Sequence, residues 1–186
     1  KAGAREARRL VREFGVKGFK FHPTMQGFYP NDRWAYPLYE AIAEEGAITL
    51  FHTGQTGVGS GMRGGMGMRL KYSNPIHLDD VAVDFPDIKI ILAHPSFPWQ
   101  EEALAVAQHK PNVYIDLSEY EFSPMAEAYV EAANTMIADK ILYASAHPFV
   151  DFRVALQSYE RLQFKPDVRQ KIMYDNAARL LGLKTA

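Results

Sequence analysis

Three histidines stand at the ends of apolar runs, and their placement indicates a shared site. His22 closes the run GVKGFKFH, His52 closes AITLFH, and His94 closes IKIILAH. An imidazole titrates near neutral pH and binds divalent metals, so it suits proton transfer or metal coordination. For one isolated histidine, a hydrogen bond to a neighbouring carbonyl is the simpler explanation. Histidines that end successive strands favour a functional site instead, because catalytic residues gather at that end of an α/β barrel.

Other polar side chains are weaker candidates for the same site. Lys20 shares one strand face with His22, because side chains alternate with a period of two. Its ammonium could hold an anionic substrate group, or its stem could pack while the charge reaches water. His77 and His147 follow the second and fifth apolar runs, and each is equally explained as a solvated surface residue. Asp116 lies inside the fourth run and needs a partner if it is buried.

The elements that must position these side chains alternate regularly. Runs typical of buried strands occupy residues 16–22, 47–52, 88–94, 113–117 and 141–145. Helical periodicity occupies residues 2–14, 34–45, 75–85, 98–109, 124–138, 152–162 and 166–181. This alternation favours a parallel sheet with right-handed crossovers.

Chain length distinguishes two forms of that sheet. A TIM barrel of eight βα units needs about 250 residues, so a chain of 186 residues would supply its last five units. The alternative, an open doubly wound sheet, normally carries a glycine fingerprint in its first βα turn or a carboxylate cluster at a switch point, and the sequence has neither at those places. We therefore expect residues 1–186 to be a single domain, the C-terminal portion of a barrel whose N-terminal strands are absent from this chain. Exposed strand edges predict that it does not fold alone.

Residues 53–73 form the longest stretch without a strand or helix pattern. They are rich in glycine and methionine, with the wording GQTGVGSGMRGGMGMRLKYS. Loops of this length in a compact domain are usually lids, binding loops or disordered segments. Because glycine permits bending and methionine lines adaptable apolar pockets, the segment from Gly54 to Tyr72 is a candidate lid. A plain connector is the alternative.

The composition excludes several classes of protein. The formal net charge of −1 gives no electrostatic case for nucleic acid or an anionic membrane as partner. No apolar run approaches the roughly 20 residues of a membrane span. The absence of cysteine fits a cytoplasmic protein. The hydrolase motifs GxSxG and HExxH are also missing. We expect a cytoplasmic homo-oligomer with a small-molecule ligand.

Several motifs together resemble the amidohydrolase-related family. They are GVKGFKFHP, LFHTG, ILAHPSFPW, VYIDLS and the closing DNAARLLGL. That family includes aminocarboxymuconate semialdehyde decarboxylases, resorcylate-type decarboxylases and hydrolases of aromatic acids. The motifs GFKFHP, RLKYSNP and HPSFPWQEEALAVA are most similar to those of 4-hydroxyphenyl-β-ketoacyl-CoA hydrolases. The resemblance implies a distorted (β/α)8 barrel with one divalent metal ion, zinc or manganese.

The resemblance also implies roles for single residues. His52 matches the family's metal ligand on the fifth barrel strand, and His94 matches the acid/base on the sixth. The His-x-His ligand pair of the first strand has no counterpart in this chain. At the last strand the family reads Ser-Asp-x-Pro, whereas this chain reads Ser145-Ala146-His147-Pro148. Ala146 therefore replaces an aspartate that normally binds the metal and takes a proton from water.

The resulting expectation is a metal-dependent hydrolase acting on an aromatic acid or its acyl thioester. His94 would transfer the proton and His52 would hold the metal. The substrate contacts would come from Lys20, His22, His77 and His147. Ala146 keeps alternatives open: a non-oxidative decarboxylase or hydratase of the same family, or an impaired barrel that only binds its ligand.

Overall fold

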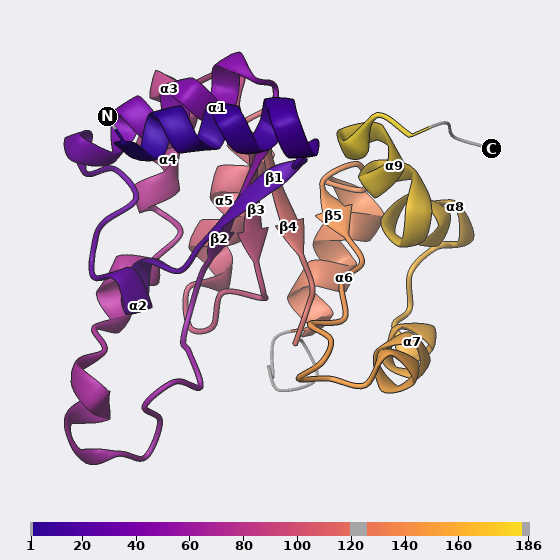
Figure 1. Ribbon diagram of the computed structural model, residues 1–186. Coiled ribbons are helices and arrows are strands. Elements are labelled where there is room, and N and C mark those ends of the chain that lie inside the picture. The colour runs from indigo at the N-terminus through magenta and orange to yellow at the C-terminus, as the bar shows by residue number, and fades with distance from the viewer. Residues whose placement is uncertain (1, 120–125, 184–186) are drawn as a thin grey trace.

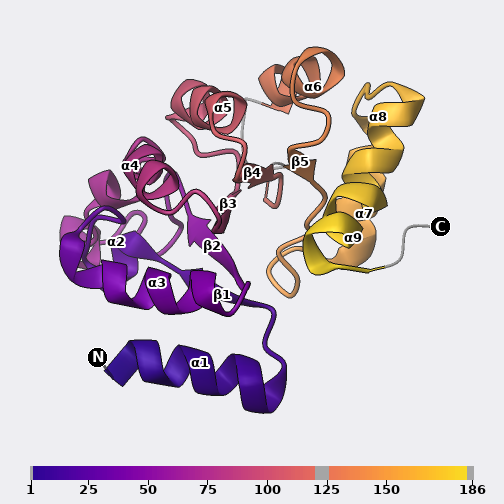
Figure 2. The same ribbon diagram turned by 90° about the horizontal axis from the view of Figure 1, so that it is seen from above.

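The computed structural model describes residues 2–119 and 126–183, which contain a five-stranded parallel sheet (Figure 1). The strands are β1 (Gly18–Phe21), β2 (Ile48–His52), β3 (Lys89–Ala93), β4 (Val113–Asp116) and β5 (Ile141–Leu142). They lie side by side in chain order, and every neighbouring pair is parallel. Seen from above, the helices form an arc around the sheet (Figure 2). The predicted succession of five βα units from a TIM barrel is confirmed.

Helices connect the strands and cover one side of the sheet. They are α1 (Ala2–Phe14), α2 (Pro23–Gln26), α3 (Tyr36–Glu44), α4 (His77–Asp84), α5 (Gln100–His109), α6 (Ala126–Thr135), α7 (Phe152–Arg161), α8 (Pro166–Gln170) and α9 (Asn176–Leu181). Short 3-10 turns are η1 (Arg33–Ala35), η2 (Arg63–Gly67) and η3 (Leu70–Ser73), and η5 (Lys171–Asp175) is a π-helical turn.

The structure corrects several predicted boundaries. The C-terminal helix predicted over residues 166–181 is divided by the π turn η5. The helix expected from residue 75 begins at His77, because residues 74–76 form a turn in which Asn74 Oδ1 accepts a hydrogen bond from Ile76 N. The stretch over residues 53–73 contains the turns η2 and η3. The start predicted for the helix over residues 124–138 lies outside the described residues.

The two faces of the sheet differ in how they are packed. Phe21, Phe51, Leu92 and Ile115 stand in register across β1 to β4, and all are buried in the core beneath the helices. Burial of each such side chain contributes about 1.5–3 kcal/mol. The alternate row, which we call the inner row, consists of Lys20, Leu50, Ile91 and Tyr114. Its members are only partly buried or exposed, so the inner face is less covered than the outer one.

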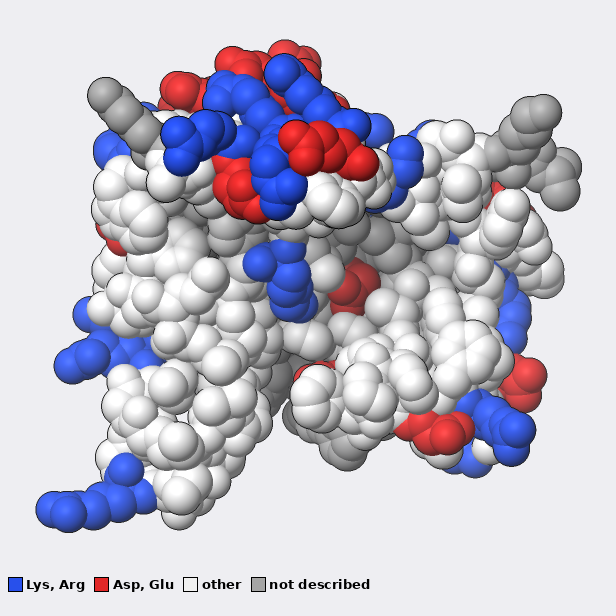
Figure 3. Space-filling view, in the orientation of Figure 1, with Lys and Arg blue, Asp and Glu red and all other residues white. Residues whose placement is uncertain are grey.

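Charged side chains of both signs collect on the N-terminal helix. Arg8 and Arg12 of α1 form ion pairs with Glu44 and Glu45, at the end of α3. Figure 3 shows these charges of both signs gathered over α1, whereas most of the face below is neutral. Exposed pairs of this kind contribute little stability, about 0–1 kcal/mol each. Within the part of the chain that the structure describes, no helix is both long and apolar enough to cross a membrane.

A buried asparagine joins the C-terminal helices to the fifth strand. Asn176 is fully buried, and its Nδ2 donates to Ala138 O at 2.9 Å and to Ile141 O at 2.8 Å. Asn176→Leu keeps a similar volume but leaves both carbonyls without this donor. We expect the free energy of unfolding to fall by about 2–4 kcal/mol in urea denaturation of the purified complete barrel.

The matched control for that substitution is Asn31→Leu. The Asn31 amide donates one hydrogen bond to Asp80, in an exposed position, so we expect a change below about 0.5 kcal/mol. Equal effects of the two leucine variants would contradict the role given to Asn176.

Candidate active site

The carboxyl ends of β1, β2 and β3 bring three histidine rings together. The rings of His22 and His52 are nearly parallel, with centroids 3.9 Å apart. The rings of His52 and His94 meet edge to face at 4.8 Å. The arrangement follows from the sequence, because parallel strands in register deliver the residues at their ends to one edge of the sheet.

His52 is the most deeply buried member of this cluster. Only 5% of its surface is exposed, and its Nε2 is buried without a hydrogen-bond partner among the described residues. Burial, together with the nearby His94 and His22, lowers the pKa of His52 to about 2. The ring is therefore neutral at physiological pH, which is the form that binds a metal ion. A buried nitrogen without a partner costs about 1–3 kcal/mol, so Nε2 is a candidate ligand atom.

The hydrogen bonds of His94 determine which of its ring nitrogens carries the proton. Nδ1 lies 2.8 Å from Ser118 Oγ and 3.4 Å from Ser118 O. The Ser118 hydroxyl donates a short hydrogen bond to Asp116 Oδ1. A hydroxyl has a single proton and a carbonyl only accepts, so Nδ1 must be the donor in both contacts. Nε2 of His94 is therefore the unprotonated nitrogen, with a lone pair available for chemistry.

Asp116 holds this arrangement in place. Its Oδ1 also accepts hydrogen bonds from His94 N at 3.2 Å and Ser118 N at 3.0 Å. Glu119 Oε2 lies 3.8 Å from His94 Nδ1, which is too long for a hydrogen bond but close enough to stabilise a positive ring. His94 and Asp116 were candidates from the sequence, whereas Ser118 was not. The period of two in VYIDLS could have revealed it, because Asp116 and Ser118 leave the strand on the same face.

His22 has a structural role as well as a place in the cluster. Its Nδ1 accepts a hydrogen bond from Met25 N at 3.3 Å and so caps the N-terminus of α2. In the neutral ring the proton is then on Nε2, the opposite tautomer to that of His94. The expected contact with substrate therefore has to come from the Nε2 side of His22.

Lys20 lies in the inner row, two residues before His22 in the chain. Partial burial lowers the pKa of its ammonium, and attraction to Asp116 and Glu119 opposes that shift. Lys20 thus interacts electrostatically with the carboxylates at the β4 end, on the face that lines the interior of a barrel. It can hold an anionic group of a ligand that reaches the histidines.

Strained backbone marks the loops that carry these residues. His94, Ser96, Glu119 and Ala146 all have positive φ angles, between 57° and 77°. Side chains other than glycine rarely adopt this region, and such residues cluster at functional sites. Gly54 has φ of 88°, and a Cβ there would lie 2.6 Å from the backbone of Ser96. Glycine at this position thus allows the loops after β2 and β3 to approach each other.

A small cleft opens beside His94. It has a volume of about 260 Å³, and its lining includes Thr53, Gln55, Thr56, Phe97 and Glu119. Thr53 and Ser96 join the two loops through a hydroxyl–hydroxyl hydrogen bond of 2.7 Å. Part of the segment from Gly54 to Tyr72 therefore lies against the site, in a position suited to a lid.

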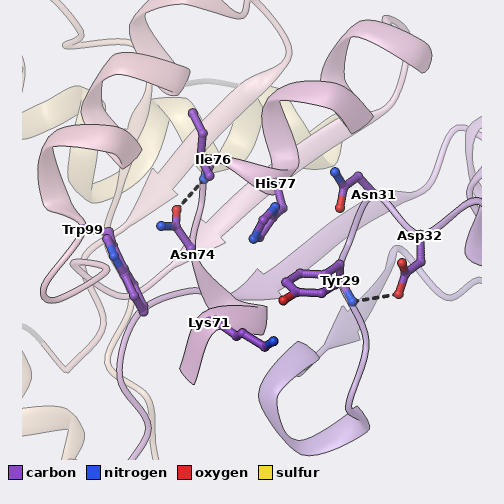
Figure 4. A pocket seen from close by; sticks show the side chains of 8 residues that line it. All are labelled: Tyr29, Asn31, Asp32, Lys71, Asn74, Ile76, His77 and Trp99. Atoms are coloured by element: carbon purple, nitrogen blue, oxygen red, sulfur yellow. Dashed lines mark hydrogen bonds between the residues drawn. The ribbon is translucent and has the colours of Figure 1, made fainter. Parts of the chain in front are cut away.

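Two of the expected substrate residues lie elsewhere. His77 begins α4 and packs against Tyr29, with ring centroids 4.7 Å apart, in a separate pocket (Figure 4). His147 is exposed, and the described residues show no ring contact or ion pair between it and the three clustered histidines. The structure therefore brings together His22, His52 and His94 but leaves His77 and His147 outside that cluster.

The described residues fit one part of a metal site. His52 Nε2, buried and without a partner, is suited to be a ligand. However, no group of three His, Cys, Asp or Glu side chains able to hold a metal ion forms within residues 2–119 and 126–183. The half-buried Ala146, after β5, offers only a methyl group. A complete coordination sphere needs donors from beyond the described residues.

Comparison with known proteins identifies the family. A family model described as Amidohydrolase matches residues 1–183, so the chain belongs to the amidohydrolase family. An uncharacterised TIM-barrel protein of Bordetella bronchiseptica is 29% identical, with a TM-score of 0.80 over 94% of this chain and 60% of that chain.

Two decarboxylases share the fold at lower identity. 5-Carboxyvanillate decarboxylase LigW of Sphingomonas paucimobilis is 19% identical, with a TM-score of 0.71 over 97% of this chain and 63% of its own. A dihydroxybenzoic acid decarboxylase of Polaromonas sp. JS666, with bound manganese and the inhibitor 2-nitroresorcinol, is 19% identical. Its TM-score is 0.70, over 98% of this chain and 66% of the decarboxylase chain. The chain thus spans about 60–66% of the length of these structures. The comparisons do not support the closer resemblance to thioester hydrolases.

Proposed function

We propose that this chain forms the C-terminal part of a metal-dependent decarboxylase that removes CO₂ from a hydroxylated aromatic carboxylate. The observation that carries the proposal is the pair of His52, buried with a free Nε2, and His94, held with Nε2 unprotonated. The decarboxylases that share the fold support this reaction over the hydrolysis that the motifs first indicated. The rest of the barrel, including the remaining ligands, would come from residues outside this chain.

The reaction requires one proton and no oxidant. The bond between the ring carbon and the carboxylate breaks, CO₂ leaves, and the electron pair stays on the ring carbon, which takes a proton. In our proposal the unprotonated Nε2 of His94 first takes a proton from the solvent, and the positively charged ring then passes that proton to the ring carbon of the substrate, while Nδ1 keeps its hydrogen bond to Ser118. Asp116 and Glu119 would stabilise the positive ring during the transfer.

The other residues of the cluster would bind and orient the substrate. Lys20 would hold an anionic oxygen, and His52 would be one ligand of a divalent metal such as manganese or zinc. When bound, the metal supplies Lewis-acid polarisation of substrate oxygens. Hydrolysis is disfavoured because Ala146 has no group that can take a proton from an attacking water.

The test is to supply the purified complete barrel with Mn²⁺ and carboxyl-¹³C-labelled hydroxybenzoates, among them 2,6-dihydroxybenzoate and 5-carboxyvanillate. We expect labelled CO₂ and the decarboxylated phenol in equal amounts from at least one of them. A hydroxybenzoyl thioester serves as the comparison substrate. Release of thiol without CO₂ would instead establish a hydrolase and end the decarboxylase proposal.

Ala146 also favours a second candidate, a barrel that binds its ligand without turnover. Such a protein would bind hydroxybenzoates but release neither CO₂ nor thiol, with metal bound or without it. The alanine at the position where the family carries an aspartate is the observation behind this alternative.

A further inference from the structure

A second, larger pocket lies outside the histidine cluster. Its volume is about 440 Å³, within the range of small-molecule sites. The segments that follow β1, β2 and β3 form it (Figure 4). The first contributes Tyr29 and Asp32, and the third contributes Trp99. The second contributes Lys71, Asn74 and His77. It shares no lining residue with the cleft beside His94. Apart from His77, none of these side chains stood out in the sequence.

Aromatic rings form two sides of this outer pocket. Tyr29 packs edge to face with His77, and Trp99 stands on the opposite side of the opening (Figure 4). Tyr29, His77 and Trp99 are all partly buried, so one surface of each ring remains accessible. Flat aromatic surfaces of this kind favour a planar ring as ligand.

The charged groups of the pocket narrow the choice of ligand. The Lys71 ammonium lies 5.5 Å from the centre of the Tyr29 ring and 5.7 Å from that of Tyr72. The neighbouring Tyr29 and Tyr72 raise the pKa of Lys71, so its ammonium stays charged. No ion pair among the described residues involves Lys71, so its charge is available for an anion. A single cation suits one carboxylate better than a phosphate, which carries more charge and would be repelled by Asp32.

Asp32 complements Lys71 within the same pocket. Its Oδ2 accepts a hydrogen bond from Tyr29 N at 2.9 Å, whereas its Oδ1 takes part in none of the hydrogen bonds recorded for the described residues. A carboxylate oxygen of this kind accepts a hydrogen bond from a hydroxyl. Lys71 and Asp32 together therefore match a ligand with an anionic group and a hydroxyl group.

We propose that this outer pocket is a second binding site, for a monocyclic aromatic carboxylate that bears a hydroxyl group. Its ring lies between Trp99 and Tyr29, its carboxylate at Lys71, and its hydroxyl at Asp32. The inference rests on the proposed function in one respect: the substrate belongs to the same class, so the site would gather substrate beside the barrel mouth. Because Lys71 and Tyr72 end the segment from Gly54, a ligand here would also hold that segment in place.

The two tryptophans of the chain make this proposal directly testable. In ¹⁵N-labelled protein, each indole N–H gives one resonance, and any further tryptophan of the complete barrel is replaced by phenylalanine. 3-Hydroxybenzoate is the probe. We expect the Trp99 resonance to shift saturably, while Trp34, which is 70% exposed and outside the pocket, does not respond.

Substitution of Lys71 tests where the carboxylate binds. In Lys71→Met we expect affinity for 3-hydroxybenzoate to fall about tenfold, whereas affinity for resorcinol, which has no carboxylate, changes less than twofold. Lys17→Met, at an exposed lysine outside the pocket, is the matched control and should bind as the parent protein does. Equal affinity of Lys71→Met and the parent for 3-hydroxybenzoate would overturn the proposal.

The same titration in His94→Asn separates this proposal from the proposed function. The Trp99 shift should persist, because His94 does not line the outer pocket. If it disappears, the ligand binds only at the strand ends and the outer site is refuted. A protein that releases CO₂ but shows no Trp99 shift would refute the outer site alone. A Trp99 shift without CO₂ release would refute the decarboxylase alone.

Discussion

Replacing His94 by asparagine is expected to lower kcat for decarboxylation by a factor of about 10²–10⁴, the usual contribution of a positioned proton donor. Asparagine retains a polar group of similar reach, but it cannot carry and release a proton near neutral pH. The main-chain hydrogen bond from residue 94 to Asp116 does not depend on the side chain. We therefore expect the fold to survive, with a melting temperature close to that of the parent.

Two further variants show whether this loss is specific. His109→Asn makes the same exchange at the end of α5, where the ring contacts Lys110 and lies away from the strand ends, and it should retain full activity. Ser118→Ala removes the hydroxyl that accepts from Nδ1 of His94. It should reduce kcat about tenfold with KM unchanged, because only the longer contact to the main-chain carbonyl of residue 118 then keeps the proton on Nδ1. If His94→Asn keeps its kcat within twofold of the parent, His94 is not the proton donor.

Introducing the missing carboxylate through Ala146→Asp is expected to raise the affinity for Mn²⁺ by at least tenfold. Residues that only hydrogen-bond to a metal ligand already contribute about 10–100-fold to metal affinity. A residue that binds the metal directly should contribute at least as much. The backbone already suits aspartate, because Ala146 has φ of 57°, a conformation that Asp adopts more readily than Ala. Competition with a chelator measures the affinity, and elemental analysis measures the metal content of each form.

Ala146→Asn is the control for this experiment. It fits the same backbone but offers a neutral amide, so its affinity for Mn²⁺ should stay close to that of the parent. An unchanged affinity in Ala146→Asp would mean that position 146 does not face the metal. If neither the parent nor Ala146→Asp binds any metal, the result would favour the barrel that only binds a ligand.

The part of the site on consecutive strands could be predicted from the sequence. His52 and His94 each end a buried apolar run, and parallel strands necessarily bring such ends together. The grouping of His22 with them follows from the same rule. Its capping of α2 did not follow, because a four-residue helix leaves no periodic signal.

Features that depend on loops could not be predicted in the same way. The outer pocket joins Tyr29 to Trp99, and residues 70 positions apart meet only through the tertiary fold. The π turn over Lys171–Asp175 interrupts a continuous helical pattern, and within it Ile172 O accepts a long-range hydrogen bond from Tyr143 N at 2.9 Å. His77 was placed with the substrate residues on its position after the glycine-rich segment, and that segment carries it to a different pocket.

The strands that carry the histidines and the strand that precedes Ala146 differ in the extent of their backbone pairing. β2 and β3 are paired on both sides, whereas β5 consists of Ile141 and Leu142 and pairs through them with β4 alone among the described strands. Local opening is easiest where backbone pairing is shortest. The short pairing of β5 with β4 should therefore open more easily than the five-residue pairing of β2 with β3, which positions His52 and His94. Ala146 follows β5 in the chain. Evolution could therefore change the residue at position 146 without disturbing the proton-transfer residues on the other strands.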